Sequence, residues 1–384
     1  ISMNLTGTGR YTNTKDCEGD LRMMSVQTKV QNRGTGSARV EIYDWLRLVA
    51  TIFVVIGHSA YLRIHTTFGG VAYAVPENIN AAYYSPVMQF FRYLSRWVYG
   101  FHMPLFFMLS GAVLALRPLG RFDAVVQSKI KRLIIPYFVY GWLFMLPVKY
   151  IGHFYSRESV LQAMQGLLSG QDAGHLWFLT ALFWCLIIFV LIEKIIIKLG
   201  CDSRYLLLLI AGLIQLTYSY IPFDVLKMKT GLSYIFWFAL GFVFEKERQE
   251  HGLWNIKKTV LAYVILTVIE FGSKRYGILN EFFVILCGSV HTFLLADILS
   301  RIFKNITKTK GWKIVTRNLF YIYLFHDPLE YVVLRLFMGH NWLSSALGCY
   351  SYTFCRIVVI FFISLIGGEL MTYLKKTAGK LLAN

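Results

Sequence analysis

A basic residue and a histidine share one face of an apolar segment near the start of the chain. Arg47 and His58 are eleven residues apart, close to three helical turns, which places them about 16 Å apart along a helix. An ionisable side chain at that depth is costly and usually faces a cavity or a polar partner. Neutral imidazole accepts protons near pH 7, so His58 is a candidate general base. The structural alternative has Arg47 snorkelling to the membrane surface and His58 bonded to a neighbouring helix.

Another histidine, His102, precedes a proline in a segment rich in phenylalanine. Pro104 can kink a helix and free a backbone carbonyl. The pair Ser110-Gly111 permits close packing of two helices. This motif is more typical of packing than of a site, with His102 as the exception.

Two later apolar segments carry polar groups that suit a substrate site. Asp172, His175 and Trp177 open one of them, and Tyr323 and His326 lie in another, where an aspartate follows the histidine. Such groups deep in an apolar run are costly unless they are functional or well paired. An aromatic belt at the membrane interface explains Trp177 and the tyrosines equally well.

A short basic cluster, Lys129, Lys131 and Arg132, lies between two apolar segments and precedes Pro136. Cations at the inner membrane surface usually report topology. They also suit a phosphate-bearing cofactor that arrives from the cytoplasm. The sequence contains no phosphate-binding GxxxxGK[ST], no HExxH and no GxSxG motif. Any chemistry is therefore expected inside a helical bundle.

The composition points to a membrane protein. Of 384 residues, 56% are hydrophobic and only 16% are charged, with a mean hydropathy of +0.51. A soluble domain carries about a quarter charged residues, and one soluble core cannot bury this much apolar surface. The net charge of +18 comes from short clusters between apolar runs, which argues against a nucleic-acid partner.

The apolar segments predict an all-α, polytopic bundle of about ten membrane helices, since a span needs about 20 apolar residues. A polar tail is expected at 1–40, the membrane domain at 41–376 and a short cytoplasmic tail at 377–384. Residues 80–96 are amphipathic and predict an interfacial helix. The ten spans are predicted near 44–64, 98–116, 133–151, 175–195, 205–221, 232–245, 258–272, 281–300, 316–337 and 352–374.

The basic residues give an orientation for these spans. With the N-terminus in the cytoplasm, the connections and tail on the inner side after residue 47 hold 21 Lys and Arg, and the outer connections hold 11. This asymmetry predicts that both termini are cytoplasmic and that the number of spans is even.

Taken together, these segments resemble the membrane acyltransferase 3 family, in the group that acylates sugars and polysaccharides. The resemblance covers about residues 41–376. It rests on five motifs in order: Arg47 and His58; Phe106, Phe107, Ser110 and Gly111; Lys129-x-x-Arg132 before Pro136; His-Leu-Trp-Phe-Leu at 175–179; and Tyr323-x-x-His326-x-Pro328. The last two are similar to blocks in glucan and fucose acyltransferases. Lys129 departs from the family's basic RxxR element, because lysine keeps the charge but loses the bidentate fork.

The resemblance implies an O-acyltransferase of the bacterial cytoplasmic (inner) membrane. The resemblance implies an acyl-CoA donor such as acetyl-CoA, which would bind Lys129, Lys131 and Arg132, and no permanently bound cofactor or metal is expected. Arg47 would position donor phosphates or stabilise developing negative charge.

The acceptor would be a hydroxyl of a carbohydrate or lipid-linked glycan. Asp172, His102, His175 and Trp177 would line its site, while His326 and Tyr323 would assist catalysis. His58 or Tyr323 as a transient acyl carrier is the alternative chemistry. A glycan transporter or exporter of the same fold is the alternative function. Membrane lipids are expected partners, and a homodimer remains open.

Overall fold

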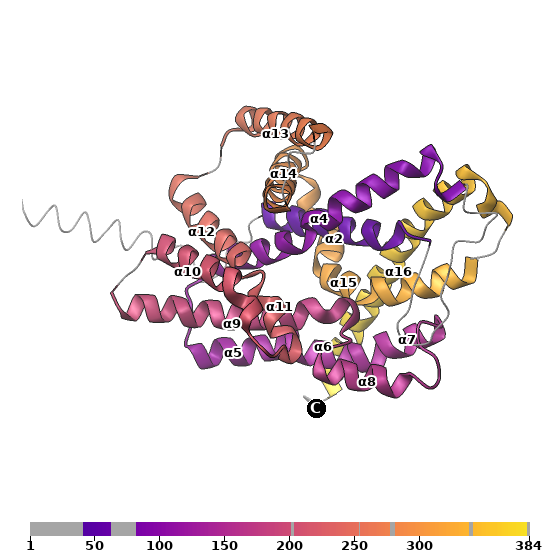
Figure 1. Cartoon of the computed structure of the whole chain (residues 1–384), viewed down its shortest axis with the longest axis horizontal. Helices are drawn as coiled ribbons and strands as arrows, with labels where there is room; N and C mark the ends of the chain where they lie inside the picture. The colour runs from indigo at the N-terminus through magenta and orange to yellow at the C-terminus, as the bar shows by residue number, and fades with distance from the viewer. Residues whose placement is uncertain are drawn as a thin grey trace, which may run out of the picture. The chain divides into compact units, whose positions relative to one another are not determined.

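The computed structural model describes residues 41–62, 82–200, 203–252, 254–276, 281–337 and 341–381. These residues form an all-α membrane bundle, and no strand occurs among them (Figure 1). The predicted tail 1–40 and residues 382–384 lie outside the described residues. Residues 377–381 belong to the last helix.

A helix occupies each of the ten predicted spans. Among the described residues, six helical stretches are long and apolar enough to cross a membrane: 41–59, 88–115, 122–151, 160–198, 281–302 and 346–377. The helices are α2 (Glu41–Ser59), α4 (Pro86–Ala115), α5 to α7 (Phe122–Lys129, Ile135–Tyr140 and Leu146–Ile151), α8 (Val160–Ser169), α9 (Trp177–Lys198), α10 (Arg204–Thr217), α11 (Met228–Leu232), α12 (Ile235–His251), α13 (Ile256–Tyr276), α14 (Glu281–Ile302), α15 (Lys310–Phe337) and α16 (Ala346–Leu381).

The number of spans stays a prediction, because four helices fall outside those six for two different reasons. α10 and α12 have 14 and 17 residues, which is short for a bilayer. α13 and α15 are long enough but carry several charges each. In α15 those charges include Asp327 and Glu330, both buried inside the bundle.

One helix differs from the sequence-based expectation. The predicted interfacial helix at 80–96 and the following span are largely one helix, α4, which runs without a break for 30 residues. Nothing between them breaks a helix, and Pro86 stands near the N-terminus, where proline is tolerated. Arg92 on its first turns reaches back to the carbonyls of Tyr83 and Tyr84. The amphipathic pattern therefore marks the N-terminal end of a long membrane helix.

α4 stands at the centre of the bundle and packs against α2, α12 and α14. Its crossing with α12 depends on two glycines. A methyl group on Gly111 would collide with the carbonyl of Phe238, and one on Gly241 would collide with the carbonyl of Met108. The Ser110 hydroxyl donates a hydrogen bond to the backbone carbonyl of Phe106 at 2.8 Å. The Ser-Gly pair therefore acts in helix packing, as the sequence indicated.

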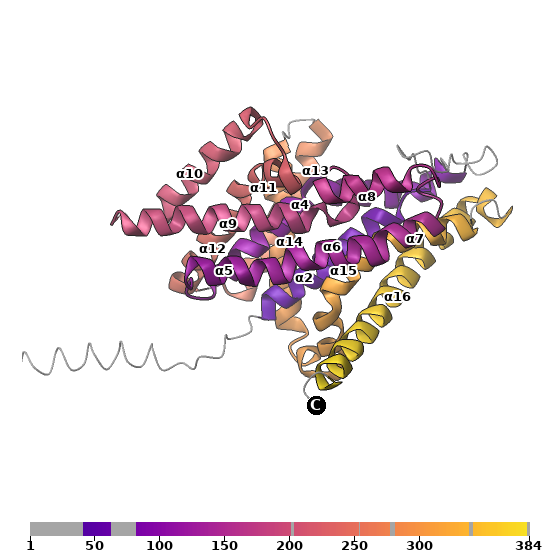
Figure 2. The ribbon, with the colours of Figure 1, turned by 90° about the horizontal axis from the view of Figure 1, so that it is seen from below.

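The helix from 122 to 151 is continuous but irregular. Figure 2 shows α5, α6 and α7 following one another in one line. Two π turns, Ile130–Ile134 and Gly141–Met145, interrupt it. Pro136 and Pro147 follow these turns, and a proline cannot donate to the carbonyl four residues earlier. The π turns accommodate the prolines, and the first of them carries Lys131 and Arg132.

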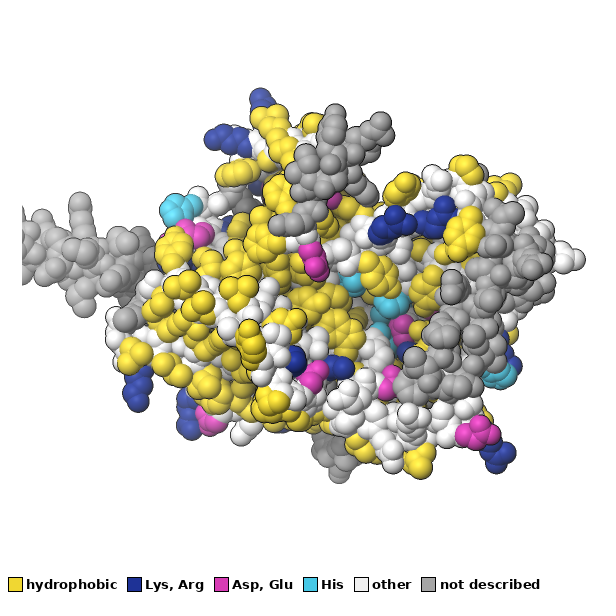
Figure 3. Space-filling view, viewed as in Figure 1, with side chains coloured by type: hydrophobic (Ala, Val, Ile, Leu, Met, Phe, Trp, Pro, Cys, Tyr) yellow, Lys and Arg dark blue, Asp and Glu magenta, His cyan; other side chains and the backbone are white. Residues whose placement is uncertain are grey.

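The surface of the bundle is strongly apolar (Figure 3). Large hydrophobic side chains are exposed along α9, α10, α13 and α16, for example Leu191, Leu213, Val268 and Ile366. A soluble protein rarely exposes apolar patches of this extent. Since helices satisfy their own backbone hydrogen bonds, such a surface is stable in lipid. The chain is therefore a multi-pass membrane protein.

Candidate active site

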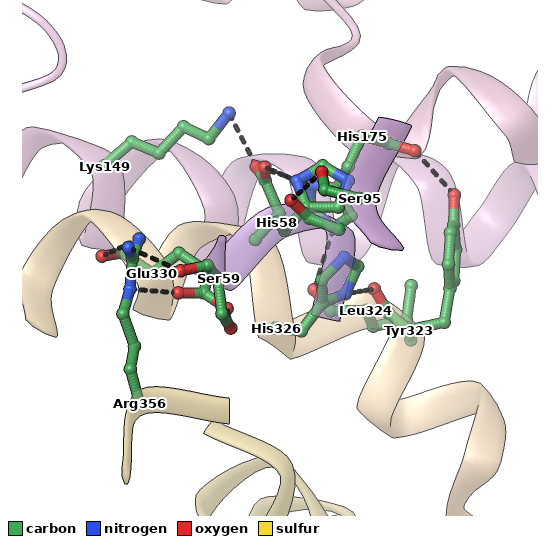
Figure 4. Close-up of polar contacts among 12 residues, drawn as sticks. His58, Ser59, Ser95, Lys149, His175, Tyr323, Leu324, His326, Glu330 and Arg356 are labelled. Carbon is green, nitrogen blue, oxygen red and sulfur yellow. Dashed lines mark hydrogen bonds and ion pairs between the residues drawn. The ribbon is translucent and has the colours of Figure 1, made fainter. Parts of the chain in front are cut away.

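A single buried carboxylate joins three basic side chains from three different helical segments. Asp327 Oδ1 lies 3.2 Å from His58 Nδ1, and its Oδ2 lies 2.9 Å from Lys149 Nζ and 3.2 Å from His175 Nδ1. Asp327, Lys149 and His175 are all buried. Figure 4 shows Lys149 and His175 near His58. An isolated charge at this depth would be prohibitively costly, so the cluster is stable only as a set.

The local sequence of α15 explains how His175 is held. Pro328 has no N–H and leaves the carbonyl of Leu324 without its helical donor. His175 Nε2 lies 3.0 Å from that carbonyl oxygen and takes the position of the missing helical donor. In return, the Tyr323 hydroxyl donates to the backbone carbonyl of His175 at 2.7 Å. Proline thus fastens the start of α9 to α15.

The Asp327 carboxylate also determines which nitrogen of His58 faces the cavity. Nδ1 points at the carboxylate, which favours the tautomer with the proton on Nδ1. Nε2 then keeps its lone pair, and the His58 side chain is 20% exposed. A carboxylate behind an imidazole holds its orientation and stabilises the imidazolium that forms when it takes a proton. His58 therefore has the arrangement of a general base.

A second histidine stands beside it with a different support. The His326 and His58 rings are 4.9 Å apart, centre to centre. His326 Nδ1 faces the backbone carbonyls of Ile322 and Tyr323 at 3.2 and 2.8 Å. Its Nε2 is buried and has no hydrogen-bond partner among the described residues. Buried polar atoms rarely stay unpaired, so a substrate hydroxyl is a natural partner for this nitrogen.

These histidines belong to a cavity of about 750 Å³, here called the central cavity. On α2 and α15 a cation precedes a histidine, Arg47 before His58 and Arg317 before His326, which sets the two groups about 14–16 Å apart. The cavity is therefore basic at one end and carries histidines at the other. Its polar and aromatic lining includes Arg47, His58, Tyr99, His102, Lys129, Arg132, His175, Trp177, Arg317, Tyr323 and His326.

The central cavity is accessible from outside the bundle. Figure 3 shows histidine side chains at the bottom of a hollow on one face of the molecule. Tyr99 is 46% exposed and its ring lies 5.9 Å from that of His58. A volume of this size is typical of sites for small molecules and cofactors. The arrangement can take an anionic group at its basic end and a polar acceptor near the histidines.

Comparison with known protein families decides the class of the chain. The model of the acyltransferase 3 family, described as an acyltransferase domain, matches residues 40–369. The chain belongs to this acyltransferase family. The nodulation protein NolL of Sinorhizobium fredii is a relative, 24% identical over 249 residues, which are 62% of this chain and 59% of NolL. The chain thus spans less than two thirds of that relative. No solved structure matches the chain.

The acyltransferase brings most of the residues predicted from sequence into one place. The cavity is lined by Arg47, His58, His102, Lys129, Arg132, His175, Trp177, Tyr323 and His326. Lys131 and Asp172 do not line it. Lys131 is exposed on the π turn beside Arg132. Asp172 accepts a hydrogen bond from Tyr155 at 3.1 Å, in the connection between α8 and α9.

Four residues that line the central cavity or contact its histidines received no role in the sequence analysis. Asp327 carried a signal, since an acidic group beside a histidine in an apolar segment needs a partner. Lys149 and Arg317 were counted only as cations that set topology. No motif in the sequence pointed to Tyr99. It lies one helical turn before Met103 on α4, and both residues line the cavity. Their roles depend on contacts between helices far apart in sequence.

A second buried ion pair stabilises the helix end that carries His58. Arg356 of α16 pairs with Glu330 of α15, and both are completely buried. The same guanidinium donates to the carbonyls of Ser59 and Tyr61 at 3.2 and 2.6 Å. The Ser59 hydroxyl donates to the other oxygen of Glu330. Since Ser59 directly follows His58, this pair fixes the end of α2 (Figure 4).

Proposed function

We propose that this acyltransferase moves an acetyl group from acetyl-CoA to a hydroxyl of a carbohydrate or lipid-linked glycan, with His58 as the general base. The observation that carries the proposal is the His58–Asp327 pair, 3.2 Å apart, in the same cavity as Arg47, Lys129 and Arg132. A hydroxyl needs a base to become a nucleophile. A phosphate-bearing donor needs cations. The family supplies the acyl transfer itself.

The donor is assigned to the basic end of the central cavity. Lys129 and Arg132 line it and, among the described residues, neither is paired with an acidic side chain. Arg317 lies at the same end but is held by Glu369, with two contacts of 2.6 and 2.8 Å. The phosphates of CoA would bind Lys129 and Arg132, and the acyl thioester would extend towards the histidines.

The acceptor is assigned to the end with the histidines and aromatic rings. Tyr99, His102 and Trp177 line it, and aromatic faces suit the apolar faces of sugar rings. A polar notch formed by His58 and His326 receives the hydroxyl. Because this part of the cavity reaches the surface, a long glycan can lie outside while one hydroxyl enters.

One histidine is sufficient for both proton transfers of the reaction. His58 Nε2 removes the proton of the acceptor hydroxyl while its oxygen attacks the thioester carbonyl carbon. The tetrahedral intermediate then breaks its carbon–sulfur bond, and His58 returns the proton to the sulfur of CoA. Asp327 stabilises the imidazolium throughout and does not itself take the proton. The products are the acylated glycan and free CoA.

A transfer assay on purified protein tests the proposal. Protein in lipid nanodiscs receives acetyl-CoA labelled in the acetyl group together with a panel of glycan and lipid-linked glycan acceptors. The expected result is labelled acceptor in the wild type and a loss of about 10²–10⁴ in rate for His58→Gln, which keeps volume but cannot shuttle a proton. Near-normal transfer by a folded His58→Gln variant would contradict the role of His58.

The same assay separates the enzyme from an exporter of the same fold. Nanodiscs have no enclosed compartment, so export cannot produce a signal in them. Label appearing on acceptor therefore reports chemistry alone. Absence of label with every acceptor, while sealed vesicles accumulate glycan, would favour the transporter.

A further inference from the structure

A second cavity of about 580 Å³ lies on the other side of α4, between α4, α12, α13 and α14. It is here called the α13 groove. Its lining is almost entirely apolar and includes Leu105, Phe244, Ile265 and Phe293. The catalytic proposal above does not use it. Leu109 lines both cavities, so one helix separates them.

The groove is built by the way α13 is attached to the bundle. Near its start, the Thr259 hydroxyl donates to Asp297 at 3.0 Å. Near its end, Glu270 accepts from Trp97 of α4 and lies 3.1 Å from Nδ1 of His291. These two attachments are about 16 Å apart along the helix. Between them α13 stands away from α12, so the walls of the groove exist without a ligand.

The mouth of the groove is apolar. Phe244, Ile265, Ile269 and Val290 line it and are 41%, 49%, 44% and 37% exposed. In Figure 1, α13 lies at the edge of the bundle, with α14 as its neighbour. In a membrane protein such an apolar opening faces hydrocarbon, so an alkyl chain is the group that suits it.

The surface beside one end of the groove carries two unpaired cations. Each acidic residue there is already paired: Glu247 and Glu250 with Arg204, Glu245 with Arg248, and Asp297 with Arg301. Lys257 and Lys258, on the first turn of α13, do not line the groove but lie in the chain between Trp254 and Thr259, which do; both lysines are exposed and have no acidic partner among the described residues. Trp254 lines the same end and is 59% exposed, as is typical of residues at the lipid headgroups.

We infer that the α13 groove binds one alkyl chain of an anionic phospholipid, whose phosphate lies at Lys257 and Lys258. The apolar walls select the chain, and the two unpaired lysines select the negative headgroup. This lipid site is separate from the central cavity and does not depend on the proposed catalytic roles.

Photo-crosslinking of the full chain in nanodiscs tests this inference. The probes are phosphatidylglycerol and phosphatidylcholine, each with a photoreactive group in the chain, in otherwise identical bilayers. We expect crosslinks within 262–269 of α13 and 290–294 of α14, and several times more with phosphatidylglycerol. Neutralising Lys257 and Lys258 with glutamine should remove most of that preference, so that the two probes label the groove nearly equally in this variant. Equal labelling of the wild type by both probes would overturn the inference.

A matched pair of variants tests the groove itself. Ala262→Trp fills the groove, whereas Val260→Trp adds the same ring at a position of α13 that does not line it. Crosslinks at 290–294 should disappear in the first and persist in the second. Unchanged crosslinks at 290–294 in Ala262→Trp would overturn the inference. The surface lysine variants supply the test if Ala262→Trp does not fold.

Discussion

At the scale of residues, the Asp327 carboxylate orients the His58 imidazole, and the Lys149 ammonium compensates the charge of that carboxylate. The Lys149 ammonium is 2% exposed and lies over the rings of Phe154 and Tyr331, at 4.6 and 4.9 Å. It is enclosed by protein and does not reach the central cavity. Its role is therefore to compensate the carboxylate that orients His58.

Removing this charge should damage both stability and catalysis. Lys149→Met leaves Asp327 buried without its strongest partner, which typically costs about 3–5 kcal/mol of folding free energy. The double variant Lys149→Met with Asp327→Asn removes both charges and should regain most of the stability. It should stay inactive, because His58 has lost its carboxylate. Unfolding midpoints and transfer rates measure the two effects, and a double variant no more stable than the single one would contradict this account.

Arg132 and Lys131 are neighbours with different surroundings, and they form a natural control pair. Arg132 lines the basic end of the central cavity and Lys131 does not. Arg132→Ala should weaken CoA binding by roughly tenfold, as expected for one lost charge-assisted bond to phosphate. Lys131→Ala should leave it nearly unchanged. Titration calorimetry with CoA checks both, and equal effects would make the cluster a simple topology signal.

Residue spacing predicted part of this site and missed the rest for a physical reason. Arg47 and His58 were placed correctly on one face because helical periodicity is a local property. Lys149 could not be assigned, because a lysine near a helix end is usually a topology signal and its partner lies on α15. Asp172 was predicted to line the acceptor site; it does not line the central cavity and accepts a hydrogen bond from Tyr155.

At the scale of helices, close contact between α4 and α12 sets the shape of the bundle. The two helices approach so closely at Gly111 and Gly241 that each faces a backbone carbonyl of the other. The rigid carbonyls of Phe238 and Met108 cannot move aside as a flexible side chain would. The crossing holds α4, whose opposite sides line the central cavity and the α13 groove.

Adding one methyl group at this crossing should therefore be destabilising. Gly111→Ala is expected to cost about 1–3 kcal/mol, the usual range for overpacking a core. Gly272→Ala on α13 is the control, because a side chain there meets no atom within 4 Å. That control should be neutral or slightly stabilising, since alanine favours a helix over glycine. Unfolding midpoints in detergent compare the two, and equal midpoints would mean that the helices separate easily.

Helix positions were more predictable than helix ends. Long apolar runs placed a helix at each expected span, because a bilayer demands about 20 apolar residues. The amphipathic start of α4 was assigned to a separate helix, since its charges, such as Arg92 and Arg96, resemble an interface. The π turns before Pro136 and Pro147 change how the side chains between them face the bundle, and simple periodicity does not reveal them.

At the scale of the whole molecule, the contacts sharpen the argument for its orientation in the membrane. Two of the 11 cations counted on the outer side, Lys149 and Arg356, are buried partners of Asp327 and Glu330. Buried cations in ion pairs do not report topology, so the outer count falls to 9 against 21 on the inner side. The positive-inside rule then favours cytoplasmic termini more strongly than the sequence alone did.

Labelling of single cysteines in intact cells tests this orientation. Gly120 and Gly311 lie in exposed connections or helix starts where a side chain meets no atom within 4 Å, so cysteine is tolerated at both. Ser169 is exposed at the end of α8, on the side predicted to be outer. In a background without the six native cysteines, a membrane-impermeant maleimide should label Ser169→Cys only. Gly120→Cys and Gly311→Cys should react only after the membrane is permeabilised. The reverse pattern would place the basic end of the central cavity outside the cell, where CoA is not supplied, and the proposed donor site would then be wrong.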